Sequence, residues 1–177
     1  FLSDQEHWKI ANLRYFNPIG AHNSGLIGED PIFLNTNLFP QITKAALGKI
    51  EKIKIFGNNW PTSDGTAVRD YIHIMDLAEG HILALQYLKK EKPQISSLNI
   101  GTGHGTSVLE RVKIFEKVNK VKVPYVFDLR RVGDNGFLVA DCSLAKSLLG
   151  WTPKRSISDM CIDGWQWQVK NPNGYCS

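Results

Sequence analysis

The sequence has few cysteines and no long hydrophobic run. Its three cysteines, Cys142, Cys161 and Cys176, have spacings that fit neither a disulfide framework nor a C-x-x-C metal site. We therefore expect reduced thiols, no bound metal and a cytoplasmic location. No stretch approaches the ~18 consecutive apolar residues of a membrane helix, and no signal-peptide pattern opens the chain. The sequence thus predicts no contact with a membrane.

Charge of one sign is also scarce. The 21 Lys and Arg residues against 17 Asp and Glu leave a net charge of +4, spread along the chain, which does not indicate a nucleic-acid partner. With 177 residues, 42% of them hydrophobic, the chain suits one globular domain or a large part of a bigger one. It begins at Phe1, and residues 1–10 resemble the tail of an amphipathic helix. We therefore expect a piece of a longer protein.

Helical and strand patterns alternate along the chain, which is typical of an α/β fold. Strands are expected over residues 10–16, 53–56, 68–74, 97–100 and 121–127, and helices over 37–48, 108–118, 143–150 and 158–169, with a further helix from Asp76 to a stop at Pro93.

Two helix starts are predicted from capping residues. Ser107 and Glu110 have the spacing of a capping box. Asp76 is expected to be the N-cap of the helix that follows it. The spacing of the apolar residues then predicts which face of this helix is buried, namely Ala78, Ile82, Leu85 and Leu88.

A glycine run at residues 101–105 lies between a predicted strand and a predicted helix. A dinucleotide-binding loop requires the spacing G-x-G-x-x-G, whereas this run has G-x-G-x-G followed by Thr106. The spacing therefore favours a structural turn over a cofactor-binding loop.

Arginines in two distant segments are better candidates for ligand binding. Arg69 lies in the segment 65–71, and Arg131 shortly precedes Asp134. A guanidinium binds a phosphate through two parallel hydrogen bonds, so two arginines on separate loops can hold a diphosphate. A carboxylate nearby can accept hydrogen bonds from ribose hydroxyls. Surface salt bridges are the alternative interpretation.

Several long motifs occur in order and carry a resemblance to a known family. They are Arg14–His22, Gly28–Pro31, Asn37–Leu38, Ile55–Gly57, Asp64–His73, Arg130–Asp134 and an ending with Trp165–Trp167 and Asn171–Tyr175. Together they resemble the C-terminal half of the UDP-glucose 4-epimerases, which are extended short-chain dehydrogenases/reductases. The resemblance covers essentially the whole chain.

The resemblance implies a fold, a cofactor and partners. Residues 1–177 would form the C-terminal, UDP-sugar-binding part of a longer α/β chain, together with the last elements of its Rossmann sheet. The N-terminal domain, which binds NAD and carries a Tyr-x-x-x-Lys motif, would be missing from this sequence. The full-length protein would be a homodimer that acts on UDP-glucose and UDP-galactose.

The resemblance also assigns roles to residues that match the family's motifs. Tyr15 and Phe16 would lie at the seam with the cofactor, and Leu138 would face the C2 substituent of the sugar, where its bulk would disfavour an N-acetyl group. The remaining substrate contacts would be Asn17, Asn37, Leu38, Lys54, Ile55, Phe56, Arg69, Arg131 and Asp134.

The family's reaction oxidises and then re-reduces the sugar at C4, a step of galactose metabolism, and it needs a Tyr-x-x-x-Lys pair as the base. The sequence contains no such pair, so we assign no catalytic residue to it. The alternatives are a UDP-N-acetylhexosamine or UDP-glucuronate 4-epimerase, and a UDP-sugar-binding module without turnover.

Overall fold

The computed structural model describes residues 7–31 and 37–175 as a mixed α/β fold. The strands are β1 (Lys9–Tyr15), β2 (Asn17–Ile19), β3 (Ile53–Phe56), β4 (Val68–His73), β5 (Gln94–Ile100), β6 (Gly105–Ser107), β7 (Tyr125–Asp128) and β8 (Phe137–Leu138). The helices are α1 (Leu38–Ala46), α2 (Ile74–Lys90), α3 (Val108–Asn119), α4 (Ser143–Leu149) and α5 (Ile157–Lys170).

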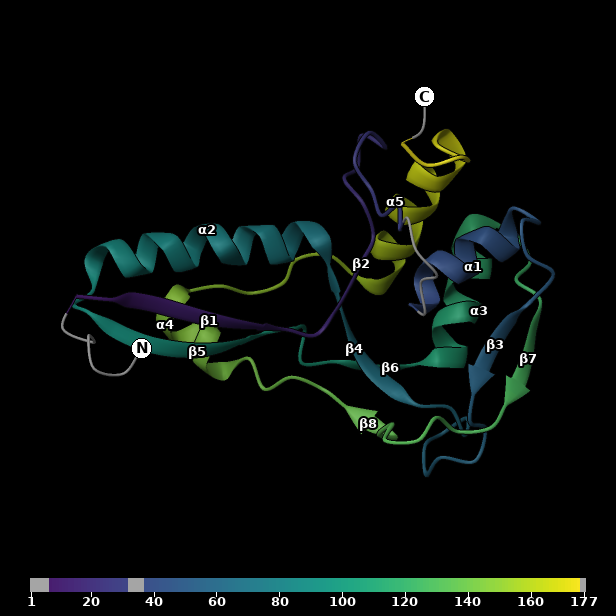
Figure 1. The fold of residues 1–177 in the computed structure, drawn as a ribbon, viewed down its shortest axis with the longest axis horizontal. Coiled ribbons are helices and arrows are strands. Elements are labelled where there is room, and N and C mark those ends of the chain that lie inside the picture. The colour runs from purple at the N-terminus through teal and green to yellow at the C-terminus, as the bar shows by residue number, and fades with distance from the viewer. Residues whose placement is uncertain (1–6, 32–36, 176–177) are drawn as a thin grey trace.

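The elements form two groups joined by β4 (Figure 1). In one group β1 pairs in parallel with β5, and α2 and α4 pack on this pair of strands. In the other group α1, α3 and α5 lie together beside β3, which pairs in parallel with β7. Between them, β4 pairs in parallel with β2 and β8 and antiparallel with β6. The strand order confirms the expected α/β class.

Adjacent residues of β4 contribute to two different hydrophobic cores. Tyr71 belongs to the core between α1, α3, α5 and β3, where Phe115 and Ile42 are fully buried. Ile72 belongs to the core between α2, α4, β1 and β5, with Leu98 and Trp151. This division follows from strand geometry, because successive side chains point to opposite faces.

The carboxylate of Asp70, also on β4, connects three segments of the chain. It is fully buried and accepts hydrogen bonds from the backbone amides of Thr102 (2.8 Å), Gly103 (2.9 Å) and Ala140 (3.2 Å), and from the Thr102 hydroxyl (2.6 Å). The glycine run therefore uses its amides to bind an anion, but the anion is the chain's own carboxylate. A Cβ atom at Gly101 would lie 2.7 Å from Asp70 Oδ2, so this close approach requires glycine.

Helix α2 differs from expectation in both its start and its buried face. Its N-cap is His73, whose Nδ1 accepts from the Met75 amide and whose Nε2 donates to Asp163. Burial of this imidazole lowers the pKa of His73, so the ring stays neutral and can accept at Nδ1. Asp76 lies inside the first turn and pairs with Arg155.

The buried face of α2 consists of Asp76, Leu77, Gly80 and Ala84, whereas three residues of the predicted face, Ala78, Ile82 and Leu85, are exposed and the fourth, Leu88, is partly buried. The contact of Asp76 with Arg155, and that of Gly80 with Trp151, place this face against the segment before α5. The prediction of the buried face from apolar spacing was therefore wrong.

Two other expectations need correction. Residues 1–6 lie outside the described residues, but residues 7–10 form a turn and the start of β1 rather than a helix. Strand β7 begins at Tyr125 and not at Val121, because residues 121–124 cover the end of α3. There the Val121 amide donates to the Glu116 carbonyl, and the Val123 amide to the Glu116 side chain.

The capping box of Ser107 and Glu110 is confirmed, as are helix α4 and the start of α3. Cys142 and Cys161 are free thiols, and Cys176 lies outside the described residues. None of the helices in the described part of the chain combines the length and apolar character that a bilayer crossing requires.

We expect Asp70→Asn to destabilise the protein by about 2–4 kcal/mol, because the new amide NH₂ would face backbone N–H groups that need an acceptor. Denaturant unfolding of the purified protein measures this loss. The control is Glu51→Gln, at a side chain that is 85% exposed, and it should change stability by less than about 0.5 kcal/mol. Equal stability of the two variants would contradict the role given to Asp70.

Candidate functional site

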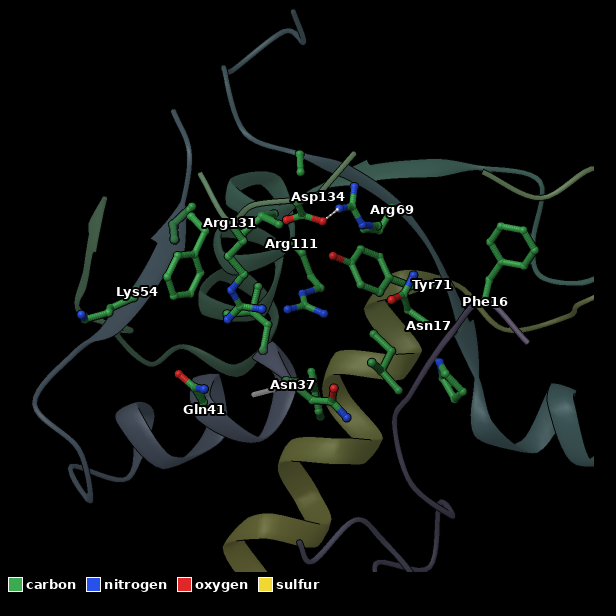
Figure 2. A pocket seen from close by; sticks show the side chains of 18 of the residues that line it. Phe16, Asn17, Asn37, Gln41, Lys54, Arg69, Tyr71, Arg111, Arg131 and Asp134 are labelled. Atoms are coloured by element: carbon green, nitrogen blue, oxygen red, sulfur yellow. Dashed lines mark hydrogen bonds and ion pairs between the residues drawn. The ribbon is translucent and has the colours of Figure 1, made fainter. Parts of the chain in front are cut away.

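A cavity of about 270 Å³ opens where β2, β3, β4 and the N-terminus of α1 meet (Figure 2). Its lining includes ten of the twelve residues assigned from the sequence, namely Phe16, Asn17, Asn37, Leu38, Lys54, Ile55, Phe56, Arg69, Arg131 and Asp134. These residues come from five separate segments of the chain, so the fold brings together what the sequence keeps apart.

Arg69 is held in place by an ion pair inside the cavity. Its Nη2 atom lies 2.5 Å from the Oδ1 atom of Asp134, and its Nη1 atom donates to the Val68 carbonyl at 2.9 Å. The two side chains are only 15% and 31% exposed, which reduces screening by water. Asp134 thereby orients the guanidinium, and the dashed line in Figure 2 marks this contact.

The neighbouring arginines 130 and 131 have different surroundings. The guanidinium of Arg131 stacks on the ring of Phe56 within the cavity, 3.9 Å from the ring centroid. The guanidinium of Arg130 stacks on Trp60 at 3.8 Å, and its Nε donates to Asn59. Arg130 does not line the cavity. The structure therefore separates a cavity arginine from one that supports the loop.

The two ends of the cavity are chemically different. At one end Lys54, on β3, pairs with Asp128 at 3.0 Å, and this ammonium lowers the pKa of Asp128. At the other end the side-chain amide of Asn17 donates to the Asp70 carbonyl at 2.9 Å, with Phe16 beside it (Figure 2). The cavity thus combines cationic side chains, an aliphatic and aromatic wall and a polar end.

The first turn of α1 faces the same space. Asn37 is its N-cap, and Leu38, Phe39 and Gln41 also line the cavity. Backbone N–H groups at a helix N-terminus favour negative charge. The helix therefore adds to the attraction that the arginines provide for an anion.

Two of the assigned residues do not line the cavity. The hydroxyl of Tyr15 lies 2.7 Å from Nε2 of His81, on α2. Leu138 lies on β8, opposite Arg69 in the register, and is 47% exposed. Neither side chain is among the residues that line the cavity.

Among the lining residues that were not assigned from the sequence, two are further functional candidates. Tyr71 and Arg111 lie side by side, with the guanidinium carbon of Arg111 4.4 Å from the ring centroid of Tyr71. Arg111 follows Val108 and precedes Val112 on the apolar face of α3. A charged residue at such a position is the signal by which it could have been found.

The described residues provide no group of three or more His, Cys, Asp or Glu side chains placed to hold a metal. The amides of Thr102 and Gly103 are occupied by Asp70, so the glycine run is not positioned for a dinucleotide phosphate. What the cavity offers chemically is the binding of an anion by the guanidinium groups in its lining.

Comparison with known proteins finds relatives of this chain. The family model described as GDP-mannose 4,6 dehydratase matches residues 3–163. The UDP-glucose 4-epimerase of Bacillus subtilis is 53% identical over 96% of this chain and 50% of its own length. That of Drosophila melanogaster is 49% identical over 97% of this chain and 49% of its own length. The chain spans about half the length of the curated relatives it matches.

Solved structures give the same picture. The UDP-glucose 4-epimerase of Bifidobacterium longum, in complex with NAD⁺ and UDP, matches with a TM-score of 0.93 and 45% identity over 98% of this chain and 51% of that one. The enzyme of Stenotrophomonas maltophila, with bound NAD and formylated UDP-arabinopyranose, matches with a TM-score of 0.91 and 46% identity over 97% and 50%.

The two adjacent arginines provide a test of the anion site. We expect Arg131→Met to weaken binding of inorganic pyrophosphate about 10-fold, because a charge-assisted pair of hydrogen bonds is lost. Arg130→Met, which removes the same charge one residue away, should leave the affinity within about twofold. Isothermal titration calorimetry measures both values, and an equal loss in both variants would indicate a nonspecific effect of net charge.

Proposed function

Since the chain belongs to the GDP-mannose 4,6-dehydratase family, we propose that the protein containing it is an NAD-dependent UDP-glucose 4-epimerase. The observation that carries the proposal is the meeting of Arg69 and Arg131, 62 positions apart, in one cavity whose lining includes ten of the assigned residues. Identities of about 50% to epimerases over nearly the whole chain support it.

We assign the parts of a UDP-hexose to the cavity by chemistry. The uracil ring would lie against Phe56 and Leu38, and the ribose hydroxyls would donate to Asp134. The diphosphate would lie at the centre, between Arg69, Arg131 and the first turn of α1. The hexose would then extend toward Asn17 and Phe16. Arg131 stacks on Phe56, so a base at this ring would either share it with the guanidinium or displace the guanidinium.

NAD fits this chain only in part. When bound, it supplies the acceptor and donor of the hydride at C4 of the sugar. Phe16, at the polar end of the cavity, would border the nicotinamide, whereas the amides of the glycine run are occupied by Asp70. The dinucleotide phosphates and the Tyr-x-x-x-Lys base would thus belong to an upstream domain. This chain would bind and orient the UDP-sugar.

An upstream Rossmann domain would also complete the packing of β1 and β5. Within the described residues these strands form a two-stranded parallel sheet, whereas parallel sheets are normally larger and covered on both faces. Next to them Ile82 and Leu85 are 56% and 62% exposed. Exposed apolar side chains beside so small a parallel sheet agree with an interface here. We therefore propose that these 177 residues form the C-terminal half of the protein.

The full-length gene product tests the proposal. With NAD present, it should convert UDP-galactose to UDP-glucose, which a coupled UDP-glucose dehydrogenase assay measures. Arg131→Met should raise the KM about 10-fold or more. A protein that binds UDP without turning over UDP-galactose would instead be a binding module, and one that binds no UDP would overturn the proposal altogether.

Leu138 offers a test of sugar specificity. It lies beside Arg69 in the register of β4 and β8, so we propose that it borders the hexose at C2. Leu138→Ser should raise kcat/KM for UDP-N-acetylgalactosamine about 10-fold relative to UDP-galactose, because steric rejection in a packed site costs about 1–3 kcal/mol.

The control for this variant is Val132→Ala, at a fully exposed side chain in the loop before β8. It should leave the ratio of the two substrates unchanged. If Leu138→Ser leaves the ratio unchanged as well, residue 138 does not determine specificity at C2.

A further inference from the structure

Arg111 is a buried cation whose polar atoms are not satisfied. It lies on α3 with only 2% of its surface exposed. Its Nε and Nη2 atoms are fully buried and make no hydrogen bond to any described residue. No Asp or Glu of the described chain forms an ion pair with it, in contrast to Arg69 and Arg155.

The guanidinium of Arg111 lines the cavity. Figure 2 shows it beside Tyr71 and near Arg131, between Lys54 at one side of the view and Asn17 at the other. The ring of Tyr71 lies 4.4 Å from the guanidinium carbon. A cation–π contact of this kind offsets part of the free-energy cost of desolvating a buried charge. It does not provide acceptors for the remaining N–H groups.

A buried guanidinium is stabilised when a negatively charged acceptor forms hydrogen bonds with it. Guanidinium groups are not deprotonated in proteins, so Arg111 cannot adapt by losing its charge. An unpaired buried charge is among the most unfavourable features of a protein interior. The cavity is the space from which a compensating anion can come.

We infer that Arg111 is a third guanidinium of the diphosphate site and binds the diphosphate from the floor of the cavity. This inference rests on the proposed function, because it identifies the ligand as a nucleoside diphosphate sugar. Of the parts of a UDP-hexose, only the diphosphate carries the charge that a buried guanidinium requires. The uracil and the hexose are neutral.

Arg111 differs from the other two arginines in its restraints. Arg69 is already paired with Asp134, and Arg131 stacks on Phe56 where a base would lie. Both exchange an existing contact when the ligand binds. Arg111 exchanges no hydrogen bond at Nε and Nη2 and is held by helix α3 and the ring of Tyr71. It is therefore the one of the three that gives up no hydrogen bond at these two atoms when the ligand binds.

The test measures UDP, UMP and uridine binding to the full-length gene product by isothermal titration calorimetry. Arg111→Met, of similar length but neutral, should weaken UDP binding about 10- to 100-fold and UMP binding less, and should leave uridine binding unchanged. Arg111→Lys keeps the positive charge but lacks the parallel N–H donors of the guanidinium, and it should bind UDP with an intermediate affinity. Lys113→Met, at an exposed position of the same helix, should bind all three ligands as the wild type does.

A second readout separates ligand binding from a structural role. Without ligand, Arg111→Met should have a Tm equal to or above that of the wild type, because an unpaired buried charge is removed. A lower Tm with unchanged UDP affinity would show that the cation–π contact is structural and would overturn the inference. An equal loss for uridine and UDP would place Arg111 at the nucleoside and overturn it as well.

The affinity of the wild-type protein for UDP distinguishes a failure of the inference on Arg111 from a failure of the proposed function. If wild-type protein binds UDP and the Arg111 variants bind it equally well, this inference fails while the proposed function stands. If wild-type protein does not bind UDP, the proposed function itself fails. If Arg111→Met does not fold, Arg111→Lys alone tests the inference. Wild-type affinity for UDP in the lysine variant would contradict a role for the parallel N–H donors of the guanidinium.

Discussion

The position of the site depends on the buried carboxylate of Asp70. Its four hydrogen-bond donors come from the loop after β5 and from the segment after β8, so three distant parts of the chain converge on one residue of β4. Arg69 precedes it, Tyr71 follows it, and its carbonyl accepts from Asn17. An anion within the fold therefore positions the residues that would bind an anion from solution. The close approach at Gly101 makes this arrangement possible.

The cavity lining has more cationic side chains (Lys54, Arg69, Arg111 and Arg131) than carboxylates (Glu29 and Asp134). Each of its three guanidinium groups is restrained in a different way: Arg69 by an ion pair, Arg111 by the face of Tyr71 and Arg131 by the face of Phe56. Aromatic faces hold a guanidinium in place while leaving its in-plane N–H groups directed elsewhere. The site can thus be both rigid and ready for a polyanionic ligand.

The sequence predicted features that depend on a few neighbouring residues. The capping box of Ser107, the strand at residues 53–56 and the helix end at Gly150 are local, and the structure confirms them. The buried face of α2 was predicted wrongly because Asp76 and its partner Arg155 are 79 positions apart. Apolar spacing alone cannot show that a buried carboxylate replaces a leucine on the packed face.

The distinction between local patterns and contacts of distant residues also applies to the site. The residues assigned to the cavity came from the resemblance, because no local pattern connects Asn37, Lys54 and Arg131. Strands β2, β6 and β8 have two or three residues each, too few for an alternation to be detected. Arg111 was missed because its role depends on its surroundings in space, namely the ring of Tyr71 and the cavity that it lines.

The alternation of Tyr71 and Ile72 along β4 has a consequence for folding cooperativity. Each core draws one wall from the same short strand, so loss of β4 would expose both interiors together. We therefore expect the two groups of elements to unfold in one transition and not as separate units.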